Sequence, residues 1–301
     1  MFPILPANSA ASSAGNDNGL FGFGYGGGAF TGVTNVVSNV GVVAADTAAV
    51  GTARSKVAAC EFGGDQGIFG FGSAGGAKTA TTNLVSNTGV VASDTAGAGG
   101  VTAEHQLAAC SFGGDQGIFG FGGDPLVGKT NLVSNTGVVA SDVSAVGTAR
   151  RSLAACEFGT DQGIFGFGVE TWPSFSDATN IVSNTGVVAS DVTGVGTART
   201  SLAACSFGED QGIFGYGYQT LSMTNLVSNT GVVASDQAAA TGTGRYGLAA
   251  CEFGTDQGIF GYGDAGGNLS MTNLVSNAGV VAADTVGVGL ARYTLGACSF
   301  N

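Results

Sequence analysis

Charged residues, prolines, tryptophan and histidine are all scarce in this sequence. Only 10% of the residues are charged, four are prolines, and Trp172 and His105 are the single representatives of their types. The formal net charge is −12 and the few cations do not cluster, so a phosphate backbone or an anionic membrane surface is not a suitable partner. We therefore expect no nucleic-acid partner.

Long apolar runs are also missing. None approaches the roughly 18 residues of a membrane-spanning helix, so we expect no membrane span. Residues 1–6 lack a basic segment, and their apolar stretch is too short for a secretory signal. The sequence therefore predicts a chain that is made in a cytoplasm and begins as written.

Glycine, in contrast, is abundant. The chain has 55 glycines and 44% apolar residues, which is too apolar for a disordered chain and typical of many short strands with tight turns. The motif N-L/V/I-V-S-N recurs at intervals of 48, 48, 49, 45 and 48 residues, starting at Asn35, Asn83, Asn131, Asn180, Asn225 and Asn273. A fixed period of this size predicts a repeat architecture and one closed body.

Each complete unit contains short apolar runs separated by turn residues. In the second unit these runs are residues 57–62, 67–72, 83–87 and 89–94. Four short antiparallel strands per unit are the content of one β-propeller blade. The first unit lacks the first of these strands, whereas the last segment, residues 295–300, is such a strand with nothing after it.

The predicted fold is therefore all-β. We expect a six-bladed β-propeller of four-stranded antiparallel blades over residues 16–301, closed by residues 295–300 pairing beside residues 19–24. Strict alternation would place Phe69 and Phe71 on one face of a strand and Gly70 on the other, so aromatic rings of one blade could meet glycines of the next.

The six cysteines occur once per repeat at one equivalent position: Cys60, Cys110, Cys156, Cys205, Cys251 and Cys298. Equivalent positions in neighbouring repeats are expected about 10 Å apart, which is too far for a disulfide. We predict reduced, buried cysteines and no zinc site.

The repeat resembles the kelch family. Residues 117–124, GIFGFGGD, are similar to the second strand of a kelch unit with its double glycine, and an arginine before the first strand recurs at Arg54, Arg150, Arg199, Arg245 and Arg292. The resemblance covers residues 17–301, although the family's Tyr and Trp are missing. The units also look like kelch-like repeat proteins of bacterial viruses. The resemblance implies the blade topology of a β-propeller.

Two rims are expected to differ in character. One carries the uniform GGDQG and SNTG turns, whose aspartates should bond backbone amides. The aspartate after the SNTG run should pair with the recurrent arginine, a rule broken by Glu104. Loops of the other rim vary, and variable loops on a rigid body are where recognition usually resides. The candidate binding residues there are Pro125, Leu126, Trp172, Phe175, Tyr218, Tyr246 and Tyr293. The alternative is that these side chains fold back over the outer blade.

Residues 1–15 precede the repeats. They could be a loose arm, or an anchor peptide whose apolar residues Phe2, Ile4 and Leu5 dock onto other virion or surface proteins.

The favoured function is a non-enzymatic structural or attachment component of a virion surface, with a host receptor or glycan on the variable rim. Homo-oligomers are possible. The alternatives are a multivalent carbohydrate-binding propeller lectin and an intracellular kelch-like adaptor. The expected location is the virion, and the alternative location is the cytoplasm or a cell surface. No repeat supplies a cluster of His, Asp and Glu, so we expect no enzyme, catalytic residue, metal or cofactor.

Overall fold

The computed structural model describes residues 17–48, 50–144, 147–237 and 242–300. Within these ranges the chain forms strands and no helix, which confirms the expected all-β class. The described strand pairings are all antiparallel. None of the described segments forms a helix that is long and apolar enough to cross a membrane.

Six sheets share one order of an inner, a middle and an outer strand. The inner strands are β5 (Ala58–Phe62), β10 (Ala108–Phe112), β14 (Ala154–Phe158), β19 (Ala203–Phe207), β22 (Ala249–Phe253) and β26 (Gly296–Phe300). The middle strands are β1 (Asn18–Gly22), β6 (Gln66–Gly70), β11 (Gln116–Gly120), β15 (Gln162–Gly166), β20 (Gln211–Gly217) and β23 (Gln257–Asp264). The outer strands are β4 (Thr34–Val37), β9 (Thr82–Val85), β12 (Lys129–Val133), β18 (Thr179–Val182), β21 (Leu221–Val227) and β24 (Asn268–Val275).

The remaining strands are short. They are β2 (Tyr25–Gly26), β3 (Ala29–Phe30), β7 (Ser73–Ala74), β8 (Ala77–Lys78), β13 (Val143–Ser144), β16 (Val169–Thr171), β17 (Ser174–Phe175) and β25 (Arg292–Tyr293). Most of them form small hairpins between a middle and an outer strand, in the loops that vary in sequence.

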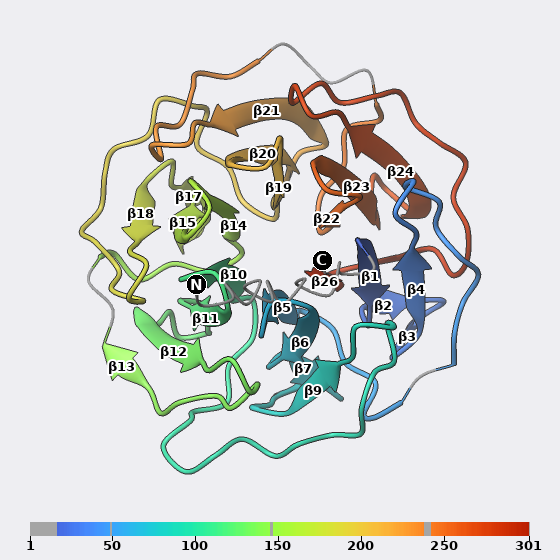
Figure 1. The fold of residues 1–301 in the computed structure, drawn as a ribbon, viewed down its shortest axis with the longest axis horizontal. Coiled ribbons are helices and arrows are strands. Elements are labelled where there is room, and N and C mark those ends of the chain that lie inside the picture. The colour runs from blue at the N-terminus through green and yellow to red at the C-terminus, as the bar shows by residue number, and fades with distance from the viewer. Residues whose placement is uncertain (1–16, 49, 145–146, 238–241, 301) are drawn as a thin grey trace, which may run out of the picture.

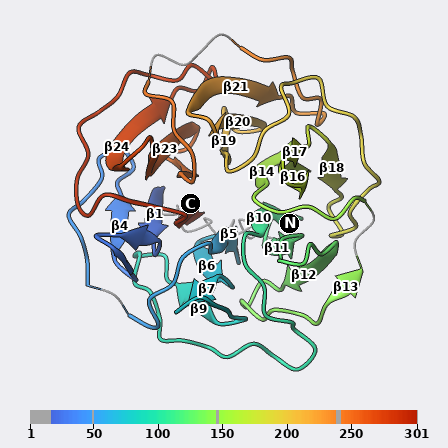
Figure 2. The same ribbon diagram turned by 180° about the vertical axis from the view of Figure 1, so that it is seen from behind.

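The sheets are arranged around a common centre, which Figure 1 shows along the shortest axis and Figure 2 from behind. The inner strands contact one another in an unbroken circuit, from β5 through β10, β14, β19, β22 and β26 back to β5. Their small residues suit this crowded position, because Ala58 and Cys60 are buried between neighbouring sheets. All six cysteines are free and buried, as predicted.

The two ends of the repeat region meet in one sheet. Strand β26 pairs with β1 in the register Gly19↔Ser299, Leu20↔Cys298 and Phe21↔Ala297, and β1 pairs with β4 on its other side. The last strand thus occupies the inner position that the first unit lacks, as its sequence predicts.

The fourth strand of each unit differs from the prediction. Apart from β13, which pairs with β12, the segment after each outer strand is held by isolated bridges, such as Val85↔Val91 and Thr82↔Thr95. These bridges leave one extra residue on the outer segment, which is the geometry of a β-bulge. The Asn83 side-chain amide fills the gap by donating to the Ala92 carbonyl at 3.0 Å and to Asp94 at 2.9 Å.

The middle strands stack through aromatic rings. A Cβ added to Gly70 would lie 2.6 Å from a ring atom of Phe119, so the ring of one sheet packs on the glycine of the preceding sheet, as predicted. The expectation that Phe69 and Phe71 share a face is wrong. Phe71 has a φ of 62°, which interrupts the alternation, so it packs edge-to-face on Phe119 while Phe69 packs on Phe23. Each sheet therefore offers an aromatic ring to both neighbours.

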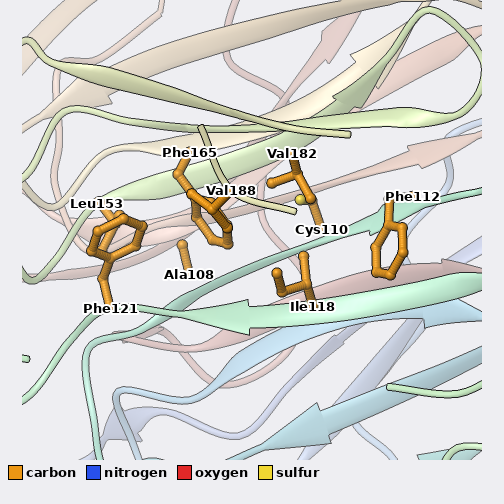
Figure 3. Close-up of a cluster of buried hydrophobic side chains, with 9 residues drawn as sticks. All are labelled: Ala108, Cys110, Phe112, Ile118, Phe121, Leu153, Phe165, Val182 and Val188. Atoms are coloured by element: carbon orange, nitrogen blue, oxygen red, sulfur yellow. The ribbon is translucent and has the colours of Figure 1, made fainter. Parts of the chain in front are cut away.

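Figure 3 shows one resulting core between two sheets. Side chains of the β10-β11-β12 sheet, including Ile118 and Phe121, face Leu153, Phe165 and Val182 of the following unit. Burying rings on both sides of every sheet stabilises the stack, at roughly 1.5–3 kcal/mol for each fully buried large side chain.

A buried arginine links each of five neighbouring pairs of units. Arg54 is fully buried, donates to the Phe71 carbonyl at 2.9 Å and to Asn83 Oδ1 at 2.6 Å, and lies 4.1 Å from the centre of the Phe23 ring. Burial lowers its pKa to about 10, and Asp94 at 3.8 Å opposes that effect. The expected Arg–Asp pairing is therefore present, but the guanidinium also bridges two sheets.

The third unit replaces this arginine by Glu104, which is also buried. Its carboxylate accepts from Lys78 at 3.0 Å and pairs with Lys129 at 3.2 Å, so two lysines compensate the inverted charge. In the other units the arginine donates to the side-chain oxygen of an asparagine, as Arg54 does to Asn83. The equivalent atom in the third unit, Asn131 Oδ1, is buried without a hydrogen-bond partner.

The uniform turns lie together, as predicted, but their aspartates use a different partner. Asp65 accepts a hydrogen bond from the Asn87 side chain at 3.1 Å, which ties the turn before β6 to the turn after β9. Equivalent bonds join Asp115, Asp161, Asp210 and Asp256 to the corresponding asparagines. We call the surface formed by these turns the uniform rim and the opposite one the variable rim.

Candidate functional site on the variable rim

Short hairpins between the middle and outer strands form part of the variable rim. Strands β16 and β17 are joined at Trp172, and β17 ends at Phe175. Strand β20 leads through Tyr218 into a tight turn to β21, where Gln219 and Thr220 both adopt positive φ. These turns place aromatic side chains from neighbouring units next to one another.

Four predicted binding residues form one contact series. Trp172 lies edge-to-face on Phe175 and on Tyr218, with ring centroids 5.7 and 5.5 Å apart. Phe175 also contacts Tyr218 at 6.1 Å, and Tyr218 contacts Tyr246 at 5.5 Å. We call Trp172, Phe175, Tyr218 and Tyr246 the aromatic arc. Edge-to-face packing holds such rings in defined orientations, and the Trp172 side chain still remains 57% exposed.

A second group of rings lies beyond the end of the arc. Tyr293 contacts Tyr25 at 6.0 Å, and Tyr25 contacts Phe30 at 5.4 Å. Tyr293 lies beside Gly247, whose Cβ would come within 3.3 Å of its ring. Tyr25 and Phe30 are not among the binding residues predicted from the sequence. They lie in the loop between β1 and β4, where Phe30 is equivalent to Phe175 and Tyr25 to Val169, and this alignment could have identified them.

The phenol of Tyr246 lies in a distinct electrostatic environment. Burial, a hydrogen bond to Asp264 and the nearby charge of that carboxylate raise its pKa to about 12. The single O–H of this phenol donates to that carboxylate, so its oxygen stays available to a ligand as a hydrogen-bond acceptor.

A hollow of about 250 Å³ lies beside the aromatic arc. Its apolar lining includes Leu126, Val169 and Trp172, and its charged lining consists of Asp124, Arg151 and Glu170. Arg151 pairs with Asp124 at 2.9 Å, which lowers the pKa of that carboxyl group through a hydrogen bond and the nearby positive charge. Leu126 and Trp172, both predicted binding residues, thus share one site.

Besides Tyr293, which belongs to the second group of rings, Pro125 and the proposed anchor do not join this site. Pro125 is exposed next to the hollow but does not line it. The proposed anchor residues Phe2, Ile4 and Leu5 lie outside the described residues.

A different hollow, of about 80 Å³, lies at the centre of the ring. Alternation along the inner strands turns the residue after each cysteine toward it: Glu61, Ser111, Glu157, Ser206, Glu252 and Ser299. Burial, reinforced by neighbouring carboxylates, raises the pKa of Glu157 to about 7 and that of Glu252 to about 8. The alternation of AACEF with AACSF in the sequence could have revealed this arrangement.

In the described ranges, no group of three or more His, Cys, Asp or Glu side chains is placed to hold a metal ion. The comparisons with known proteins add no analogy, because no protein-family model matches the chain and no curated protein matches it in sequence.

Proposed function

We propose that the protein is a six-bladed, kelch-like β-propeller that acts as a non-enzymatic attachment protein and presents its variable rim to a partner. The six sheets of common strand order, the circuit of inner strands and the β1–β26 pairing support the propeller. A location on a virion surface, expected from the resemblance to repeat proteins of bacterial viruses, is part of the proposal.

The observation that carries the recognition role is the aromatic arc. Three loops from successive units contribute side chains that contact one another, and Trp172 at the end remains 57% exposed. Exposed aromatic clusters on a rigid body are a common feature of binding surfaces, where such residues supply much of the binding energy. The uniform rim offers exposed valines such as Val187 but repeats the same turn in successive units.

Binding of the fluorescently labelled protein to a panel of bacterial cells tests this proposal. The double variant Trp172→Ala/Tyr218→Ala should lose at least tenfold in cell-bound signal. Val187→Ser is the matched control, because Val187 is 64% exposed on the uniform rim, and it should leave binding unchanged. Equal binding by both variants would contradict a recognition role for the variable rim. Recovery of the protein in purified virus particles would test the location separately.

Carbohydrate binding is a second candidate function. It is favoured by the hollow that combines an exposed tryptophan with charged side chains. A lectin with six equivalent sites is not favoured, because the chain has a single tryptophan.

A further inference from the structure

We propose that the hollow beside Trp172 binds one pyranose ring of a neutral saccharide. This inference rests on the recognition role proposed for the variable rim and names the ligand class of its main hollow. Three features of the hollow support it: the fixed orientation of the Trp172 ring, the ion pair between Arg151 and Asp124, and the volume of the hollow.

Trp172 provides an aromatic face in the lining of the hollow. Phe175 and Tyr218 contact Trp172 at 5.7 and 5.5 Å, so the indole cannot turn freely, yet more than half of the side chain is open to a ligand. The flat, apolar C–H face of a pyranose stacks well on such an indole, because both surfaces are rigid and little conformational freedom is lost. Leu126 and Val169 extend the apolar part of the lining.

The polar groups match the hydroxyls at the edge of a sugar ring. The carboxylates of Asp124 and Glu170 are acceptors only, whereas Arg151 is a donor only. A sugar hydroxyl can donate to the former and accept from the latter at the same time. The ion pair of Arg151 with Asp124, at 2.9 Å, holds two of these groups in position before a ligand arrives.

The charges also argue against other ligands. Two carboxylates and one guanidinium line the hollow, which disfavours a phosphate or a carboxylated sugar. A quaternary ammonium ligand prefers several aromatic walls, but here Trp172 is the aromatic side chain in the lining. A hollow of about 250 Å³ is small for a folded partner's loop and suits a single ring.

The single tryptophan makes the test direct, because its fluorescence reports on this hollow alone. The intact protein is titrated with methyl glycosides of glucose, galactose, mannose and N-acetylglucosamine, and it is applied to a glycan array. We expect at least one neutral sugar to change the Trp172 emission saturably, with a dissociation constant in the millimolar range, as befits one ring in an open site.

The variant Glu170→Gln should weaken this binding about tenfold, because it removes a charged acceptor. Glu209→Gln is the matched control: Glu209 is exposed in a turn of the uniform rim, and the same change there should leave the dissociation constant unaltered. If neither the titration nor the array detects a neutral sugar, or if tetramethylammonium changes the emission where sugars do not, the inference is overturned.

The cell-binding experiment separates this inference from the proposed function. Loss of cell binding in Trp172→Ala/Tyr218→Ala without any sugar signal would leave the recognition rim in place and refute its ligand class. Sugar binding to Trp172 together with unchanged cell binding by the same double variant would refute the attachment role and support the sugar site.

Discussion

The glutamates at the centre of the ring make the protein's stability dependent on pH. Glu157 and Glu252 have pKa values of about 7 and about 8 in the folded protein, against an ordinary value of 4.5. Burial is the largest cause for both, and the charges of Asp161 near Glu157 and of Glu157 near Glu252 add to it. The folded protein therefore retains two protons that the unfolded chain has already released between pH 5 and pH 7.

The direction of the effect follows from proton linkage. Because the folded state binds more protons, the free energy of unfolding should fall as the pH rises, by about 1.4 kcal/mol per pH unit for each retained proton. The full loss is reached above the folded pKa values. It amounts to roughly 3 kcal/mol for Glu157 and roughly 5 kcal/mol for Glu252, the latter as an upper limit because the Glu157 carboxylate contributes to the raised pKa of Glu252.

Urea denaturation at half-unit steps from pH 5 to pH 8 measures this slope. The window avoids the buried thiols, whose raised pKa values affect stability only at higher pH, and the paired aspartates, whose lowered pKa values affect it at lower pH. His105 does titrate inside the window, and its lowered pKa makes stability rise with pH, but it involves one proton against two for the glutamates, so the net stability still falls. Glu157→Gln/Glu252→Gln should flatten the curve and be more stable than the wild type at pH 8. A wild-type stability that is constant or rises across the window would refute the reasoning.

Three further predictions concern the contacts between units. Arg199→Met should lower the free energy of unfolding by about 2–4 kcal/mol in urea denaturation, because buried acceptors lose their donor; a loss below about 0.5 kcal/mol would contradict this role. Gly120→Ala should cost about 1–3 kcal/mol, since its Cβ would lie 2.7 Å from the neighbouring ring, whereas Gly99→Ala, with open space around it, should be near neutral; equal effects would argue against the stacking. Glu104→Arg alone should lower the melting temperature by several degrees because it faces two lysines, and adding Lys129→Thr should recover most of that loss; no recovery would contradict the compensation.

The strand order could be predicted from the sequence because it follows from local patterns. The period fixed the number of units, the alternation of small and apolar residues indicated the inner and middle strands, and the unmatched strand at residues 295–300 predicted its pairing with β1. The packing of one sheet on the next could also be predicted, because glycines and aromatic residues recur at fixed positions and a ring of one sheet fits against a glycine of its neighbour.

Other features depend on backbone conformation that the sequence pattern does not encode. The positive φ of Phe71 turns its ring toward the following unit, against the simple alternation of a strand. The bulge beyond Thr82 follows from the Asn83 side chain competing for backbone partners, which replaces the regular fourth strand. Both effects recur in every unit, so they are properties of the repeat and not of one sheet.

The candidate site was predicted in composition but not in arrangement. Variable loops with aromatic residues indicated Trp172 and Tyr218, but their mutual contact depends on the curvature of the ring, which brings successive loops side by side. Arg151 was missed because it follows the repeated Arg150 and looks like part of the same motif. Its side chain instead reaches Asp124 of the preceding unit.

Closure of the ring by its two chain ends is the central claim, and nuclear Overhauser effects between backbone protons test it most directly. In the intact, isotope-labelled protein we expect cross-peaks that connect Gly19 with Ser299 and Phe21 with Ala297, in the antiparallel register of β1 and β26. Cross-peaks from β1 to β4 alone, with no contacts to residues 296–300, would contradict a closed ring.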